Sequence, residues 1–78
     1  MESKLNPVKP TFLALHRRLI SVVNSKLRNG EFTERGLARV MNISQPHLHH
    51  VLKQTRKLQP ELADKLMLKL GINILDLL

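Results

Sequence analysis

The sequence predicts an all-α fold, a compact domain of four to five helices. Apolar residues recur at spacings of three and four along most of the chain, as they do on one face of a helix. Side chains that begin and end helices stand between these stretches. Aromatic residues that favour strands are nearly absent, since the 78 residues include two Phe and no Trp or Tyr. The expected helices are residues 11–28, 34–41, 45–53, 60–70 and 74–78.

The first helix has a recognisable start and end. The Thr11 hydroxyl can cap its N-terminus, and Asn29-Gly30 stop it. Its apolar stripe is expected to face the core and comprises Phe12, Leu15, Leu19, Val22, Val23 and Leu27. Residues 1–10 hold two prolines, two lysines and few apolar side chains. We therefore expect a flexible N-terminal arm at 1–10, followed by one domain at 11–78.

The second helix is short and ends in a tight turn. Thr33 can accept an N–H at its start, while Phe32 and Leu37 have the spacing of a hydrophobic staple. Asn42 follows the last helical residue, and asparagine tolerates the left-handed conformation that often ends a helix. Ser44 comes two residues later and offers a second cap. The pattern predicts two helices joined by a turn.

The third helix begins with Gln45 and Pro46. Proline is acceptable in a first turn because its missing N–H would have had no helical partner. The Ser44 hydroxyl is therefore expected to accept the N–H of His47. At about 100° per residue, one side of this helix is apolar and faces the second helix, with Leu48, Val51 and Leu52. The opposite side carries Pro46, His49, His50 and Lys53, with Gln45 and His47 on the flanks. No acidic residue lies between Glu34 and Glu61.

This pair of helices resembles the lambda-repressor and Cro-like (XRE-type) helix-turn-helix family. The matching residues are Leu37-Ala38, Met41-Asn42-Ile43, Ser44-Gln45, Leu48, Val51, Pro60 to Leu70, and Gly71 to Leu75. The resemblance covers roughly Thr11 to Leu78. It implies that residues 45–53 form a recognition helix in the major groove of DNA. The chain departs from the family at Asn42, Leu52 and Gln54, where the family often has Gly, Glu and Gly.

The resemblance and the chemistry of the side chains together suggest which residues touch DNA. The expected base-reading residues are Gln45, Pro46, His49 and His50. Gln45 can hydrogen-bond adenine N6 and N7, and the Pro46 ring can touch a thymine methyl. In the family, the position of His50 often touches bases. The expected backbone contacts come from Ser44, Arg35, Arg39, His47, Lys53, Arg56 and Lys57. Glu34 would lie near a phosphate in the family arrangement, which is electrostatically unfavourable.

Each of these residues also has an ordinary surface role. Gln45 could be a solvated first-turn residue, Ser44 only a cap and Pro46 only a helix starter. The basic residues could serve solubility alone. Three histidines within four residues cannot converge on one ion, and with no cysteine the sequence predicts no metal site and no cofactor. Histidine changes charge between about pH 5 and 8, so DNA binding is expected to tighten toward about pH 6.

Composition restricts the class of function. The formal charge of +7 and the pI of about 10.7 favour a polyanionic partner. The chain lacks cysteine, a long apolar run and a signal-peptide core, so a cytoplasmic protein is expected, bacterial or phage by resemblance. Scarce aromatics disfavour single-stranded nucleic acid. No glycine-rich serine elbow, carboxylate pair or phosphate-cradling loop indicates an enzyme, and no small-molecule ligand is evident.

The predicted function is sequence-specific binding of double-stranded DNA by a transcriptional regulator, expected to be a repressor. One such domain contacts few base pairs, so a homodimer on DNA is expected. The apolar residues Ile74, Leu75, Leu77 and Leu78 either join two subunits or cover the domain's own core. Two alternatives remain. The chain could be a protein-interaction module of antitoxin or repressor-antagonist type, or the DNA-binding fragment of a longer regulator.

Overall fold

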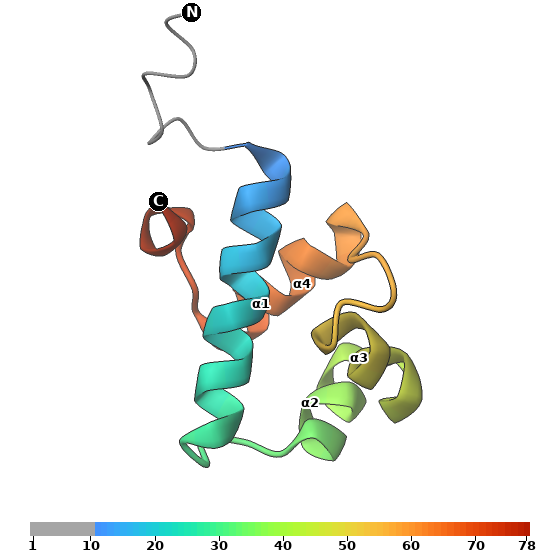
Figure 1. The fold of residues 1–78 in the computed structure, drawn as a ribbon. Helices are drawn as coiled ribbons and strands as arrows, with labels where there is room; N and C mark the ends of the chain where they lie inside the picture. Colours follow the sequence, from blue (N-terminus) through green and yellow to red (C-terminus); the bar gives the residue numbers. More distant parts are fainter. Residues whose placement is uncertain (1–10) are drawn as a thin grey trace, which may run out of the picture.

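Four α-helices and a short C-terminal 3-10 helix form the fold in the computed structural model, which describes residues 11–78 (Figure 1). The elements are α1 (Phe12–Arg28), α2 (Glu34–Met41), α3 (Gln45–Leu52), α4 (Pro60–Leu70) and η2 (Ile74–Leu77). The all-α prediction is confirmed, and the predicted helix bounds hold to within one residue. The predicted arm at 1–10 lies outside the described residues. Within residues 11–78 no helix is both long enough and apolar enough to cross a membrane.

One hydrophobic core joins all five elements. The long helix α1 lies between the C-terminal segment on its left and α2, α3 and α4 on its right (Figure 1). α3, α4 and η2 pack on α1, whereas α2 packs on α3 and α4. The most deeply buried side chains are Leu19, Val23, Met41, Leu48, Val51 and Leu66. No polar or charged residue of the described chain is buried. Burial of apolar surface is therefore the main source of stability.

The predicted core stripe of α1 is wrong at one position. Phe12 is 73% exposed, whereas Ile20, which was not assigned to the stripe, is 5% exposed. Phe12 is the first residue of α1 and lies at the rim of the molecule, where its ring stacks on that of His16 with centroids 5.4 Å apart. The core begins one turn later, with Leu15 packed against it.

The predicted N-terminal caps are present. The Thr11 hydroxyl accepts the N–H of Ala14 at 3.1 Å, and the Thr33 hydroxyl accepts that of Gly36 at 3.0 Å. A β-carbon added at Gly36 would lie 3.0 Å from the same Thr33 oxygen. Glycine therefore leaves room for the cap of α2. At α4, Gln59 occupies the cap position but its side chain makes no cap hydrogen bond.

All four α-helices end in the same way. In each, a backbone N–H just past the helix donates to the carbonyl five residues earlier: Glu31 to Lys26, Ile43 to Ala38, Thr55 to His50, and Ile72 to Met67. The residue before each donor has positive φ: Gly30 at 77°, Asn42 at 61°, Gln54 at 62° and Gly71 at 66°. These are Schellman ends, in which a left-handed residue turns the chain back over its last turn. The left-handed turn predicted at Asn42 is confirmed, and Gln54 adopts one without being glycine.

Candidate nucleic-acid interface

Helix α3 is held by its apolar side. Leu48 and Val51 have no exposed surface and Leu52 is 4% exposed. These side chains share the core cluster with Leu37 and Met41 of α2. The predicted division of α3 into an inward and an outward side is confirmed.

The other side of α3 faces solvent. Gln45, Pro46, His49 and His50 are exposed, while His47 is partly buried. The predicted base-reading residues border one shallow open hollow of about 300 Å³, together with Glu34 of α2. The structure therefore brings together all four residues predicted to read bases, and it adds one residue that was not among them.

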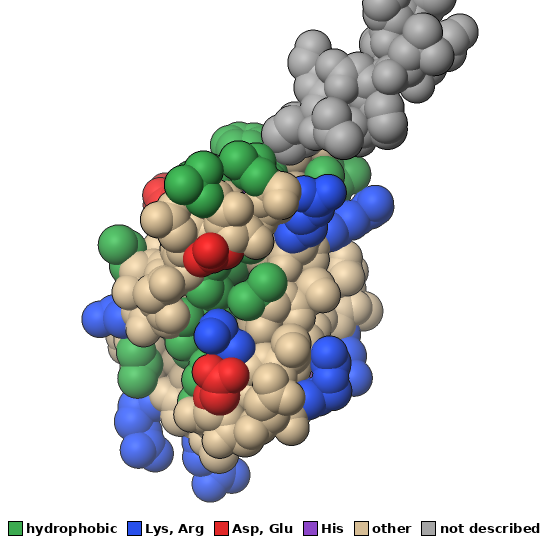
Figure 2. All heavy atoms as spheres, turned by 90° about the vertical axis from the view of Figure 1, so that its left-hand side faces the viewer, with side chains coloured by type: hydrophobic (Ala, Val, Ile, Leu, Met, Phe, Trp, Pro, Cys, Tyr) green, Lys and Arg blue, Asp and Glu red, His purple; other side chains and the backbone are tan. Residues whose placement is uncertain are grey.

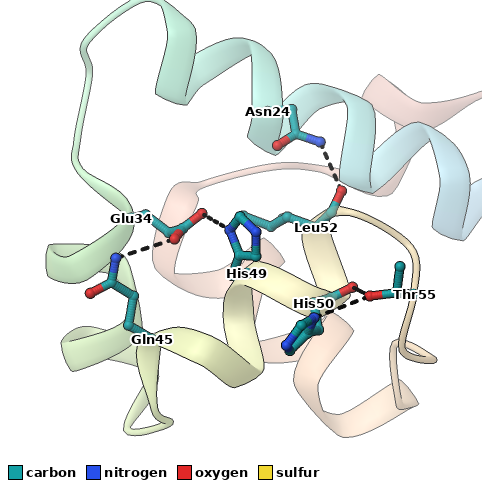
Figure 3. Close-up of polar contacts among 7 residues, drawn as sticks. All are labelled: Asn24, Glu34, Gln45, His49, His50, Leu52 and Thr55. Carbon is teal, nitrogen blue, oxygen red and sulfur yellow. Dashed lines mark hydrogen bonds and ion pairs between the residues drawn. The ribbon is translucent and has the colours of Figure 1, made fainter.

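Glu34 connects the first turn of α2 to the exposed side of α3 (Figure 3). Its Oε1 accepts a hydrogen bond from Nε2 of Gln45 at 3.3 Å, and its Oε2 lies 3.3 Å from Nδ1 of His49. The Glu34 side chain is 27% exposed and that of His49 is 46% exposed. Because this one carboxylate contacts both Gln45 and His49, it restricts the conformations of both side chains. Glu34 was expected to be electrostatically unfavourable near a phosphate. In the structure its carboxylate orders two of the predicted base-reading residues.

Sequence reasoning did not assign Glu34 this role. One signal could have revealed it: Glu34 is the first residue of α2, and Gln45 is the first residue of α3. Packing α2 against α3 brings these two helix starts together. Only the angle between the helices decides whether their side chains meet.

His50 holds the loop that follows α3. Its Nδ1 lies 3.3 Å from the Thr55 hydroxyl, and this hydroxyl lies 3.1 Å from the backbone carbonyl of His50 (Figure 3). The backbone N–H groups of Thr55 and Arg56 also donate to that carbonyl, at 3.0 and 3.2 Å. One residue of α3 thus orders the chain leading to Arg56 and Lys57.

The predicted backbone-contacting cations are exposed and unpaired within residues 11–78. They are Arg35 and Arg39 on α2, and Lys53, Arg56 and Lys57 after α3. The ion pairs of the described chain are Lys26 with Glu31 and His49 with Glu34, so none of the five cations is in one. Ser44 caps α3, as predicted, by accepting the N–H of His47 at 3.2 Å. These positive charges therefore remain free to meet an anion.

A second, apolar surface lies near the C-terminus. Figure 2 shows hydrophobic side chains, in green, on the face that carries this segment. Ile74 is 51% exposed, Leu75 69% and Leu78 62%, whereas Leu77 is 3% exposed. The Arg18 guanidinium donates to the Leu77 carbonyl at 2.7 Å and ties η2 to α1. Of the roles left open for this terminus, covering the core applies to Leu77, whereas the other three side chains face outward.

Metal binding finds no geometric support in the described part of the chain. No group of three or more His, Cys, Asp or Glu side chains in residues 11–78 is placed to hold an ion.

Comparisons with protein-family models, curated proteins and solved structures found no match to this chain. The geometry of α2, α3 and the following loop is thus the basis for assigning a function.

Proposed function

We propose that this chain is a sequence-specific double-stranded-DNA-binding protein of the lambda-repressor and Cro-like (XRE-type) class, acting as a transcriptional repressor. The observation that carries the proposal is the exposed side of α3. Gln45, His49 and His50 form a polar row on a helix whose apolar side packs into the core, and the one carboxylate beside this row, that of Glu34, contacts Gln45 and His49. A row of hydrogen-bonding side chains on a protruding helix can read base edges in the major groove, which admits an α-helix.

The two-helix unit supports this assignment. α2 and α3 are joined by a three-residue turn with Asn42 in the left-handed conformation, and they pack through buried apolar side chains. In a helix-turn-helix, the first helix crosses the DNA backbone while the start of the second meets the bases. Gln45, at the start of α3, would then face a base edge, and Pro46 would lie beside it.

Phosphate contacts would come from both ends of this unit. Arg35 and Arg39 extend from α2, whereas Lys53, Arg56 and Lys57 follow α3. Ser44 and His47 lie at the N-terminus of α3, where the helix dipole favours an anion, and the Ser44 hydroxyl that caps the helix can still donate its own proton to a phosphate. Cations on both sides of the recognition helix would fix its depth and register on the duplex.

A homodimer on DNA fits the short recognition helix. Eight residues of α3 extend for about 12 Å at 1.5 Å per residue, so one copy would contact only a few base pairs. Two copies on half-sites about one helical turn apart would supply useful affinity. In this proposal the exposed Ile74, Leu75 and Leu78 join the two subunits. No catalysis, cofactor or metal is needed for this role.

The same apolar surface favours one alternative function. A protein-interaction module of antitoxin or repressor-antagonist type would use Ile74, Leu75 and Leu78 to bind another protein. A DNA-binding fragment of a longer regulator would use this surface to contact the rest of that chain. The interaction module does not explain the polar row on α3, and the fragment of a longer regulator would bind DNA through that same row, so DNA binding is the preferred function.

The direct test is selection from a pool of random-sequence duplexes by the purified chain, followed by sequencing of the bound DNA. A short palindromic or repeated enriched motif supports specific, dimeric recognition. Salt-sensitive retention with no enriched motif would contradict sequence-specific binding. Retention of no DNA, together with capture of a protein that survives nuclease treatment, would favour the interaction module.

A further inference from the structure

The hydrogen bond to Glu34 determines which nitrogen of His49 carries the proton in the neutral ring. A carboxylate can only accept, so Nδ1 of His49 must donate across the 3.3 Å separation from Oε2. A neutral imidazole has one N–H, and its other nitrogen is then an acceptor. Within residues 11–78, Nε2 of His49 has no hydrogen-bond partner. His49 therefore offers an acceptor to solvent.

Thr55 imposes the same state on His50. The Thr55 hydroxyl has one proton, and it donates that proton to the His50 carbonyl, which can only accept. The hydroxyl oxygen is then left to accept from Nδ1 of His50, 3.3 Å away. Nε2 of His50 is thus also an acceptor. The two neighbouring rings, with centroids 5.8 Å apart, are fixed in one tautomer by partners from two different segments.

We infer that the neutral rings of His49 and His50 read exocyclic amino groups, so that the DNA half-site places adenine or cytosine opposite each of them. This inference rests on the proposed docking of α3 in the major groove. In that groove only adenine N6 and cytosine N4 are amino donors, whereas guanine O6 and N7 and thymine O4 accept. Every base pair carries one such amino group, so an acceptor nitrogen selects A or C on the strand that it faces and thereby fixes the orientation of the pair.

Gln45 adds a compatible preference. One of the two hydrogens on its Nε2 is used by Glu34, which leaves the second hydrogen and Oε1 for DNA. This remaining donor–acceptor pair matches adenine N7 and N6. Together the three ordered side chains fix the orientation of the base pairs that they contact, with adenine at the Gln45 position.

Protonation reverses the preference of the histidines but not that of Gln45. A protonated imidazole donates from both nitrogens, so Nε2 would then favour guanine O6 or N7. The charged group that contacts these rings is Glu34 from α2, and the cations nearest to them in the sequence are Lys53, the C-cap of α3, and Arg56 in the following loop. Protonation would therefore change the base preference at two positions and not at the third.

The test is random-duplex selection by the full chain at about pH 8 and about pH 6. At about pH 8 we expect each of the two histidine positions to prefer one strand orientation of its base pair by about tenfold. At about pH 6 this preference should disappear or reverse, while adenine at the Gln45 position is retained. No orientation preference at the histidine positions at about pH 8, or an identical motif at both pH values, would overturn the inference.

Two matched variants separate the rings. Glu34→Gln replaces the carboxylate by an amide, which can donate to Nδ1 as well as accept from it and so frees the tautomer of His49. Thr55→Val removes the hydroxyl next to His50. Of the two histidine positions, each variant should relax the base preference at about pH 8 at one only, and at a different one in each case. Relaxation of both positions by either variant, or of neither by both, would contradict the tautomer assignment. If no motif is enriched at either pH, the proposed function itself fails.

Discussion

The side-chain amide of Asn24 on α1 donates a hydrogen bond to the backbone carbonyl of Leu52, 3.2 Å away, in the last turn of α3 (Figure 3). The last four carbonyls of a helix have no partner within the helix. Asn24 therefore caps the C-terminal end of α3 from another element. The same bond fixes how the proposed recognition helix is oriented on the body of the molecule.

Replacing Asn24 by Ala should lower the free energy of unfolding by about 1 kcal/mol, because a partly buried carbonyl loses its donor. Denaturant unfolding of the purified variant measures this. Ser21→Ala, at an exposed position of α1, is the matched control and should change stability by less than about 0.5 kcal/mol. An equal effect of the two substitutions would mean that the bond contributes nothing to stability.

Gln54 should be replaceable by glycine with a gain in stability. Its φ of 62° lies in the left-handed region, where a residue that carries a β-carbon is strained. We expect Gln54→Gly to stabilise by about 0.5–1 kcal/mol, measured by the shift in thermal unfolding. Gln54→Ala keeps the β-carbon and should give no gain. Equal behaviour of the two variants would show that strain at Gln54 is absent.

Local rules account for most of what the sequence predicted correctly. The caps at Thr11, Thr33 and Ser44 and the left-handed Asn42 depend on interactions within a few residues, so they can be read without the tertiary structure. The buried and exposed sides of α3 follow from helical periodicity alone. The residues proposed to contact DNA were identified from this periodicity together with the family resemblance and the chemistry of the side chains.

The remaining features depend on how the elements meet. The Glu34 contacts with Gln45 and His49 require the angle between α2 and α3, and no local pattern encodes it. The exposure of Phe12 depends on how far neighbouring elements extend along α1. The left-handed Gln54 was missed because glutamine carries no signal for that conformation. Contacts between segments distant in the sequence were the main features that the sequence analysis did not predict.

Arg56 and Lys57 should determine how DNA binding depends on salt. Each phosphate contact releases condensed counterions, so removing both side chains should weaken binding to every duplex and reduce the log–log salt slope by about 2. Titration of Arg56→Ala/Lys57→Ala against a random duplex over a salt series measures the slope. Lys69→Ala, in the last turn of α4, removes a cation outside the proposed interface and should leave the slope near that of the parent. An unchanged slope in the double variant would show that neither residue touches phosphate.

Leu75 should be needed for two copies to bind together and not for folding. It is 69% exposed, so Leu75→Glu should leave thermal unfolding nearly unchanged but place a charge in the proposed subunit contact. We expect loss of cooperative binding to a two-half-site duplex, by about tenfold or more, with affinity for a single half-site retained. Leu75→Met keeps the apolar surface and should bind like the parent. Cooperativity that survives Leu75→Glu would place the subunit contact elsewhere.

The central claim is that the exposed side of α3 reads bases, and the specificity ratio tests it most directly. Affinity for the selected duplex is compared with affinity for a scrambled duplex of the same length and composition, for the parent chain and for Gln45→Ala/His50→Ala. The account predicts that the ratio falls by about tenfold or more, since each lost base contact costs about 1–3 kcal/mol, while affinity for the scrambled duplex changes little. Equal losses on both duplexes would contradict the account, because they would make these side chains part of a contact that does not distinguish one sequence from another.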